Sequence, residues 1–176
     1  MPSAPDAILE DHEGRSLLRF ERVLHSPPGR VWKALTEHDE LRSWHPSPFE
    51  MEPVVGGAVH YLSPEGTALG DGEVTAYEPP RLLAYTWGDD HLRWELRAHD
   101  NGCLLILEHT FDNHYKAARD AAGWHLCLDA LSASLTGAMP PAASGEAAIL
   151  AGWRELNSAY EERFAIPPEK ATPPPL

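Results

Sequence analysis

The sequence has few cysteines and few basic residues. Its two cysteines, Cys103 and Cys127, belong to no CxxC pair, which argues against a zinc finger. Both are interpreted as small core residues, because a disulfide is not expected in a reduced cytoplasm. The chain carries 14 Lys and Arg against 27 Asp and Glu, a formal net charge of −13. Because phosphate binding needs clustered cations, nucleic acid and anionic membranes are not expected as partners.

Long apolar runs and a targeting signal are also missing. No segment approaches the roughly 18 consecutive apolar residues that suggest a membrane span. The N-terminal segment MPSAPDAILEDHEGR has no basic stretch followed by an apolar one, so no secretory signal is expected and the protein is predicted to be cytoplasmic. The 176 residues are 43% apolar and 23% charged, which suits a single globular domain.

Motifs for metal, phosphate or nucleophilic chemistry are not found. The ten histidines form no HxH, HxxxH or HExxH pair, so neither a metal nor another cofactor is expected. The stretch Gly70-Asp71-Gly72 lacks the spacing and the lysine of a phosphate-binding loop. Ser26 and Ser132 have no recognisable His and Asp companions, so hydrolysis through a serine nucleophile has no support.

The two ends of the chain differ from its middle. Residues 1–14 show no periodicity and are predicted to be a flexible arm. The tail 167–176 is proline-rich and is expected to be extended or disordered. The segment 138–166 is assigned to an extra helix, from about Gly145 to Phe164, that packs on the main domain. The main domain is assigned to residues 15–137.

The start of the main domain predicts one strand and two short helices. Residues 15–25 alternate apolar and polar side chains, as a strand does. Ser26 stands before two prolines, which predicts a helix start with a hydroxyl cap and proline in the first turn. A second short helix is expected over residues 39–44.

The rest of the main domain predicts a meander followed by a long helix. Turn-forming Gly, Pro, Asp and Asn recur at roughly ten-residue intervals between Phe49 and Gly102, and the segments between them alternate as strands do. From about Asn113 to Thr136 the apolar spacing changes to that of an amphipathic helix. The residues of this stripe are Ala121, Trp124, Leu128, Leu131 and Leu135.

These elements predict an α+β fold. A curved antiparallel sheet of six to seven strands wraps around the long C-terminal helix, with the two short helices after the first strand. A sheet that buries one face needs a cover, and only the long helix can supply it. Aromatic side chains between the two layers are expected to hold them apart and leave an apolar cavity.

Several segments match a known family in the correct order. They are SPPGRVWKALTEHDELRSWHP (26–46), VVGGAVHY (54–61), GEVTAYEPPRLLAYTW (72–87), LRWELRAHDNGCLLILEH (92–109) and the Gly123-Trp124 start of the long-helix signature. With these motifs the chain resembles the START-like (SRPBCC) superfamily and its helix-grip, Bet v-like fold. Within that superfamily it is similar to the family of the C-terminal domain of the activator of the heat-shock-protein-90 ATPase (AHSA-type). The resemblance covers residues 15–137 and implies binding of small hydrophobic ligands.

Candidate ligand-binding residues lie on the inward faces of the predicted elements. They are Trp44, Tyr85, Trp87, Trp94, Leu107, His109, Trp124, His125 and Leu128. Core filling is the competing interpretation of the aromatics, since rings at strand or helix period usually pack in a core. A buried neutral imidazole at His109 or His125 is likewise more often a satisfied core group than a general base. His45 is interpreted as an exposed loop residue, with gating of the site as the alternative.

The sequence is compatible with three functions. The leading hypothesis is binding of a small hydrophobic molecule in the internal cavity. An enzyme acting on a hydrophobic carbonyl compound, of cyclase, aromatase or hydratase type, would need His109, His125 or a tyrosine to converge on one wall with shifted pKa values. A co-chaperone-like module that contacts a heat-shock ATPase, or a homodimer, would need an exposed apolar patch on the last helix around Trp153.

Overall fold

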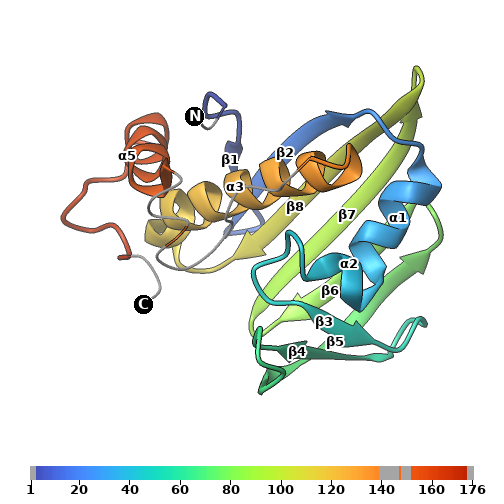
Figure 1. Ribbon diagram of the computed structural model, residues 1–176. Coiled ribbons are helices and arrows are strands. Elements are labelled where there is room, and N and C mark those ends of the chain that lie inside the picture. Colours follow the sequence, from blue (N-terminus) through green and yellow to red (C-terminus); the bar gives the residue numbers. More distant parts are fainter. Residues whose placement is uncertain (1–2, 139–146, 148–151, 174–176) are drawn as a thin grey trace.

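The computed structural model describes residues 3–138, 147 and 152–173 (Figure 1). The elements are β1 (Ile8–His12), β2 (Arg15–Leu24), α1 (Pro28–Thr36), α2 (His38–Leu41), β3 (Phe49–Met51), β4 (Ala58–Leu62), β5 (Ala68–Glu78), β6 (Leu82–Trp87), β7 (Asp90–His99), β8 (Gly102–Phe111), the 3-10 turn η1 (His114–Lys116), α3 (Ala117–Leu135) and α5 (Arg154–Arg163).

The strands form one antiparallel sheet with the order β1-β2-β8-β7-β6-β5-β4-β3. Strands β3 to β8 follow one another as a meander, and β2 pairs with β8 at the far side, Ser16 opposite Phe111 through Leu24 opposite Cys103. Helices α1, α2 and α3 lie on one face of the sheet (Figure 1). The α+β, helix-grip architecture predicted from the sequence is therefore confirmed, with eight described strands in place of six to seven.

The additional strand is β1, which lies in the segment that was predicted to be a flexible arm. Its residues pair with β2, from Ile8 opposite Arg19 to His12 opposite Arg15. Glu13 and Gly14 join the two strands with φ values of 54° and 82°, as a two-residue hairpin turn requires. Most side chains of this edge strand are exposed, so it has no apolar alternation. Backbone hydrogen bonds to β2 hold this strand in place, so no side-chain pattern in the sequence could predict it.

The helices differ from expectation mainly at their ends. Helix α1 follows Pro27, and no side chain caps it, so the cap predicted at Ser26 is wrong. Ser26 is instead buried. Helix α2 is shorter than the predicted segment 39–44 and ends at Leu41. The long helix is confirmed: the Asn113 side chain accepts a hydrogen bond from the Tyr115 N–H to start η1, and α3 runs to Leu135.

The C-terminal part packs back on the domain. Helix α5 lies against α3 and covers the later part of the predicted helix over 145–164; residues 145–146 and 148–151 lie outside the described residues. The tail was expected to be extended or disordered. Residues 168–170 instead form a turn, and the Thr172 N–H donates to the Tyr115 carbonyl at 3.1 Å. None of the described helices has both the length and the apolar character needed to cross a membrane.

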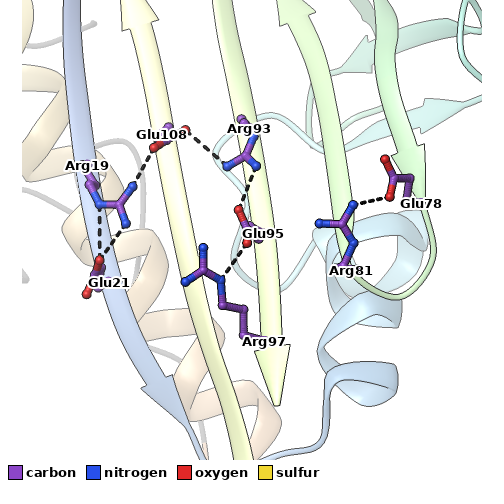
Figure 2. Close-up of polar contacts among 8 residues, drawn as sticks. All are labelled: Arg19, Glu21, Glu78, Arg81, Arg93, Glu95, Arg97 and Glu108. Carbon is purple, nitrogen blue, oxygen red and sulfur yellow. Dashed lines mark hydrogen bonds and ion pairs between the residues drawn. The ribbon is translucent and has the colours of Figure 1, made fainter. Parts of the chain in front are cut away.

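The two faces of the sheet differ in chemistry because successive side chains alternate between them. The outer face carries a ladder of ion pairs (Figure 2). Arg19 on β2, Glu108 on β8 and Arg93 on β7 lie directly opposite one another, and Glu108 bonds both guanidinium groups at 2.6 and 3.3 Å. Glu95 joins Arg93 to Arg97 at 2.7 Å each. Opposite charges across neighbouring strands stabilise the pairing, so this face serves the sheet itself.

Candidate functional site

Aromatic side chains fill the space between the sheet and α3. They come from β3, β4, β6, β7, α3 and the segment after α2, and neighbouring ring centroids lie 5.0–6.4 Å apart. We call this set the aromatic cluster: Trp44, His45, Phe49, Tyr61, Tyr85, Trp87, Trp94 and Trp124. All are buried except Trp87, which is half-buried and brings the cluster to the surface. Five predicted site residues, Trp44, Tyr85, Trp87, Trp94 and Trp124, are thus brought together.

His45 lies at the centre of the cluster. Its ring centroid is 5.3–5.7 Å from those of four neighbours: Trp44, Phe49, Trp87 and Trp124. The interpretation of His45 as an exposed loop residue is wrong, because only 5% of it is exposed. The segment is irregular, as Pro46 and Pro48 indicate, but it turns the imidazole inward. The Ser47 N–H donates to the His45 Nδ1 at 3.0 Å and fixes this orientation.

This contact also determines the protonation state of His45. Burial lowers the pKa of His45 to about 3, so the ring is neutral at pH 7. A neutral imidazole has one N–H, and Nδ1 is occupied as an acceptor, so the hydrogen is on Nε2. Nε2 lies 3.4 Å from the Tyr85 hydroxyl oxygen. His45 therefore presents an N–H donor to the interior.

The other polar atoms of the cluster are neutral as well. Burial raises the pKa values of Tyr85 and Tyr61, so both hydroxyls keep their protons at neutral pH. The Tyr61 hydroxyl donates to the Thr86 carbonyl at 2.7 Å. The Trp94 Nε1–H donates to the Tyr85 oxygen at 3.0 Å. Ser47 Oγ is buried with no hydrogen-bond partner among the described residues. The site thus combines apolar ring faces with uncharged hydrogen-bonding groups.

A hydrogen-bonded chain anchors Trp124 to the sheet. Its Nε1–H donates to the His109 Nδ1 at 3.1 Å, which places the His109 hydrogen on Nε2, 2.7 Å from an Asp90 oxygen. Lys116 Nζ donates to the same Asp90 oxygen at 2.5 Å. Burial alone would raise the pKa of Asp90, but the bonds from His109 and Lys116 outweigh it and hold the pKa below its ordinary value. His109 therefore orients Trp124.

The same region brings together a group with metal-ligand chemistry. Ligand atoms of Asp90, His109 and Asp120 lie within 4.8 Å of one another, on three elements, so sequence spacing could not reveal the group. The Lys116 ammonium already lies 2.5 Å from Asp90 and 3.5 Å from Asp120. A metal on the His109 Nε2 would require a proton on Nδ1, where the Trp124 N–H already donates. Asp90, His109 and Asp120, neutralised by Lys116, are therefore better suited to hold Trp124 in place than to bind a metal.

His125 is not part of the cluster. Although it follows Trp124 in the chain, its Nδ1 lies 2.8 Å from the Tyr160 hydroxyl on α5, and its Nε2 lies 2.9 Å from Ser3 Oγ. It therefore faces the other side of α3, and the convergence of His109 with His125 does not occur. The two predicted leucines are buried: Leu107 lies opposite Trp94 in the sheet, and Leu128 follows Trp124 by one helical turn.

The cleft that the described residues form is not the apolar cavity predicted between the sheet and the long helix. An open cleft of about 400 Å³ lies between α2 and the end of α3. Its lining includes Glu37, Asp39 and Glu40, which do not suit a neutral apolar molecule. Around His45 the rings of the aromatic cluster are in contact, so a guest there requires some of them to move.

Comparisons with solved structures identify the fold. A conserved protein of unknown function from Enterococcus faecalis is 21% identical with a TM-score of 0.71, over 90% of each chain. CalU16 from Micromonospora echinospora is 20% identical with a TM-score of 0.70, over 93% of this chain and 99% of that one. A protein from Bordetella parapertussis is 26% identical with a TM-score of 0.62, over 94% and 95%. These likenesses agree with the helix-grip arrangement.

The sequence comparisons are more specific about the family. A search of curated protein sequences found no match. The family described as "Activator of Hsp90 ATPase homolog 1-like protein" matches residues 25–136, from the end of β2 to the end of α3. This span includes the whole aromatic cluster and more than half of the chain. The chain therefore belongs to the Activator of Hsp90 ATPase homolog 1-like family, within the START-like superfamily.

Proposed function

We propose that this protein binds a small, neutral, hydrophobic molecule at the aromatic cluster. The observation that carries the proposal is the cluster itself, in which eight rings surround uncharged polar groups and reach the surface at Trp87. Aromatic walls with a few polar groups are typical of small-molecule sites. The proposal agrees with the hydrophobic ligands that membership of the superfamily implies.

The electrostatics of the cluster favour a neutral ligand. His45, Tyr61 and Tyr85 are all uncharged at neutral pH for the reasons given above. A charged molecule would lose its hydration there without gaining an opposite charge, which costs several kcal/mol or more. An apolar molecule loses little and exchanges ring–ring contacts for ring–ligand contacts.

Trp87 is the ring most readily displaced by a guest. It is the least buried member of the cluster and lies against the stacked Tyr61 ring at 5.1 Å, with an interplanar angle of 12°. It also ends β6, directly before the Gly88 turn, where φ is +59°. In our proposal the guest enters beside Trp87, inserts between this ring and those of His45 and Tyr61, and packs against all three.

The same features argue for binding over acid–base catalysis. A histidine whose pKa is about 3 is a weak base at neutral pH, and a tyrosine whose pKa is raised does not ionise there. His109 is bonded at both ring nitrogens, and His125 lies on the other side of α3. The cluster can orient a molecule by hydrogen bonds, but these groups do not supply a base.

The burial of Trp153 differs from what the interaction-module hypothesis predicts. Trp153 was expected to form an exposed apolar patch, but only 8% of it is exposed. Trp153 itself therefore offers little apolar surface to a chaperone or to a second copy of the chain.

Titration with the neutral apolar dye N-phenyl-1-naphthylamine tests the proposal. We expect a saturable fluorescence increase at about one dye per chain and a dissociation constant in the micromolar range, as ordinary for small apolar ligands. Trp87→Ala should weaken dye binding at least roughly tenfold, because a large aromatic contact is lost. Trp32→Ala is the matched control, since Trp32 packs on Tyr77 outside the cluster. Absence of saturable binding, or equal losses in both variants, would contradict the proposal.

A further inference from the structure

The Tyr85 hydroxyl carries a proton for which no acceptor is found among the described residues. The Tyr85 oxygen accepts from the Trp94 Nε1–H at 3.0 Å. The His45 Nε2, which carries the ring hydrogen, also faces this oxygen, at 3.4 Å. Both contacts deliver hydrogens to Tyr85, so neither uses the proton of its own hydroxyl. No other hydrogen-bond partner of the Tyr85 hydroxyl is found among the described residues.

An unpaired donor in such a place is unfavourable. Tyr85 is 1% exposed and surrounded by rings. Burying a hydroxyl without a hydrogen bond destabilises the folded protein. The 3.4 Å contact is also long for a hydrogen bond, so the His45 N–H is weakly used. Two adjacent donors, the Tyr85 O–H and the His45 Nε2–H, are therefore available to one acceptor atom.

We infer that the molecule bound at the aromatic cluster contains a neutral carbonyl oxygen, which accepts hydrogen bonds from Tyr85 and His45. This inference rests on the proposed function and specifies its ligand class. A carbonyl oxygen has two lone pairs and can accept from both donors at once. A carboxylate would also accept, but it would bring a charge into a site whose own groups are neutral. A pure hydrocarbon would leave both donors unpaired.

The test compares fluorene with 9-fluorenone, planar molecules of nearly the same shape that differ in one carbonyl group. Each displaces N-phenyl-1-naphthylamine from the protein, which gives the two affinities. We expect fluorenone to bind about tenfold more tightly than fluorene, as a hydrogen bond to an otherwise unpaired donor implies. In Tyr85→Phe this preference should fall to about twofold or less, because the variant lacks the O–H that donates to the carbonyl oxygen.

Tyr61→Phe provides the matched control, because this tyrosine belongs to the same cluster but already donates to Thr86. Its variant should keep the preference for fluorenone. A second measurement needs no variant: the infrared carbonyl stretch of bound fluorenone should shift to lower wavenumber than in hexane, as hydrogen bonding requires.

The outcomes separate the inference from the proposed function. Equal binding of the two compounds to the unmodified protein, or an unshifted carbonyl stretch, overturns the inference and leaves hydrophobic binding intact. Binding of neither compound contradicts the proposed function, and the inference fails with it.

Discussion

Trp124 and His125 are neighbours on helix α3, but their side chains enter different surroundings on its two sides. On the sheet side, Trp124 joins a neutral aromatic cluster in which a tyrosine proton and the Ser47 hydroxyl have no partner among the described residues. On the other side, His125 bonds both Ser3 and Tyr160. The Tyr160 oxygen in turn accepts from the backbone N–H groups of Asp6 and Ala7 at 3.2 and 3.4 Å.

We interpret the sheet side of α3 as a binding surface and the α5 side as a structural one. The Tyr160 hydroxyl and both ring nitrogens of His125 are hydrogen-bonded and hold the N-terminal segment, α3 and α5 together, although Arg22 Nη2 and Asn157 Oδ1 on this side have no hydrogen-bond partner among the described residues. Buried polar groups that are under-paired are costly to the folded protein and favour the arrival of a partner. The comparison predicts that substitutions on the sheet side change ligand binding, whereas substitutions on the α5 side change stability alone.

The largest expected effect is the loss of stability when a buried tryptophan on one or the other side of α3 is truncated. Trp124→Ala and Trp153→Ala should each lower the free energy of unfolding by about 3–5 kcal/mol, as truncation of a buried Trp does. Urea unfolding measures this loss. Only Trp124→Ala should also weaken binding of N-phenyl-1-naphthylamine, by at least about tenfold. Loss of dye binding in a folded Trp153→Ala variant would mean that the two sides are not separate.

The pH dependence of stability comes next. Folding holds the pKa values of His45 and His125 near 3 and 4, below the ordinary 6.5, mainly through burial. The unfolded chain therefore binds more protons than the folded one between pH 6.5 and 4, so stability is full above pH 6.5 and falls as the pH falls. For the fully buried His45 the loss is about 1.4 kcal/mol per pH unit in this window.

Removing either histidine should flatten this profile. We expect His45→Gln and His125→Gln each to have a shallower fall in urea-unfolding free energy between pH 6.5 and 4.5 than the unmodified protein. His12→Gln, at an exposed position on β1, is the control and should keep the original slope. Only His45→Gln should alter the preference for fluorenone. An unchanged slope in both variants would contradict the neutral state assigned to the buried rings.

A smaller effect is expected at Tyr160. Tyr160→Phe removes the acceptor of two backbone N–H groups and the partner of His125, which should lower stability by about 1–3 kcal/mol. Binding of N-phenyl-1-naphthylamine should stay within about twofold of the original, since Tyr160 and His125 face away from the aromatic cluster. Weaker dye binding would show that α5 and the cluster are coupled.

The smallest effect is expected on the outer face of the sheet. Glu108→Gln removes the carboxylate between Arg19 and Arg93 (Figure 2). Because these side chains are partly exposed, the cost should be at most about 1 kcal/mol and should shrink in 1 M salt. A loss that is larger, or that does not respond to salt, would give this ladder a role beyond strand pairing.

Periodicity predicted the elements that bury an apolar face. The strands from β2 to β8 and the helix α3 follow from alternation or helical spacing, and so do the inward positions of Tyr85, Trp94 and Trp124. Periodicity could not predict β1, whose side chains are mostly exposed and whose stability comes from backbone hydrogen bonds. It also could not exclude the Ser26 cap, because the position of a helix end depends on tertiary contacts.

The centre of the site was harder to predict. Two prolines correctly marked the segment around His45 as irregular, but outside regular structure no pattern relates a side chain to the inside or the outside of the fold. Trp124 and His125 show the reverse problem. Both are buried on α3, yet neighbouring helix residues point about 100° apart, and only the position of α5 shows that His125 belongs to another network.

The most direct test of hydrophobic binding at the aromatic cluster uses the indole N–H signals of the six tryptophans in a proton–nitrogen NMR spectrum. On titration with 9-fluorenone, we expect the indole signals of Trp87, Trp94 and Trp124 to shift, while those of Trp32 and Trp153 stay in place. Shifts confined to Trp32 or Trp153, or no shift at any indole up to the solubility limit of fluorenone, would contradict it.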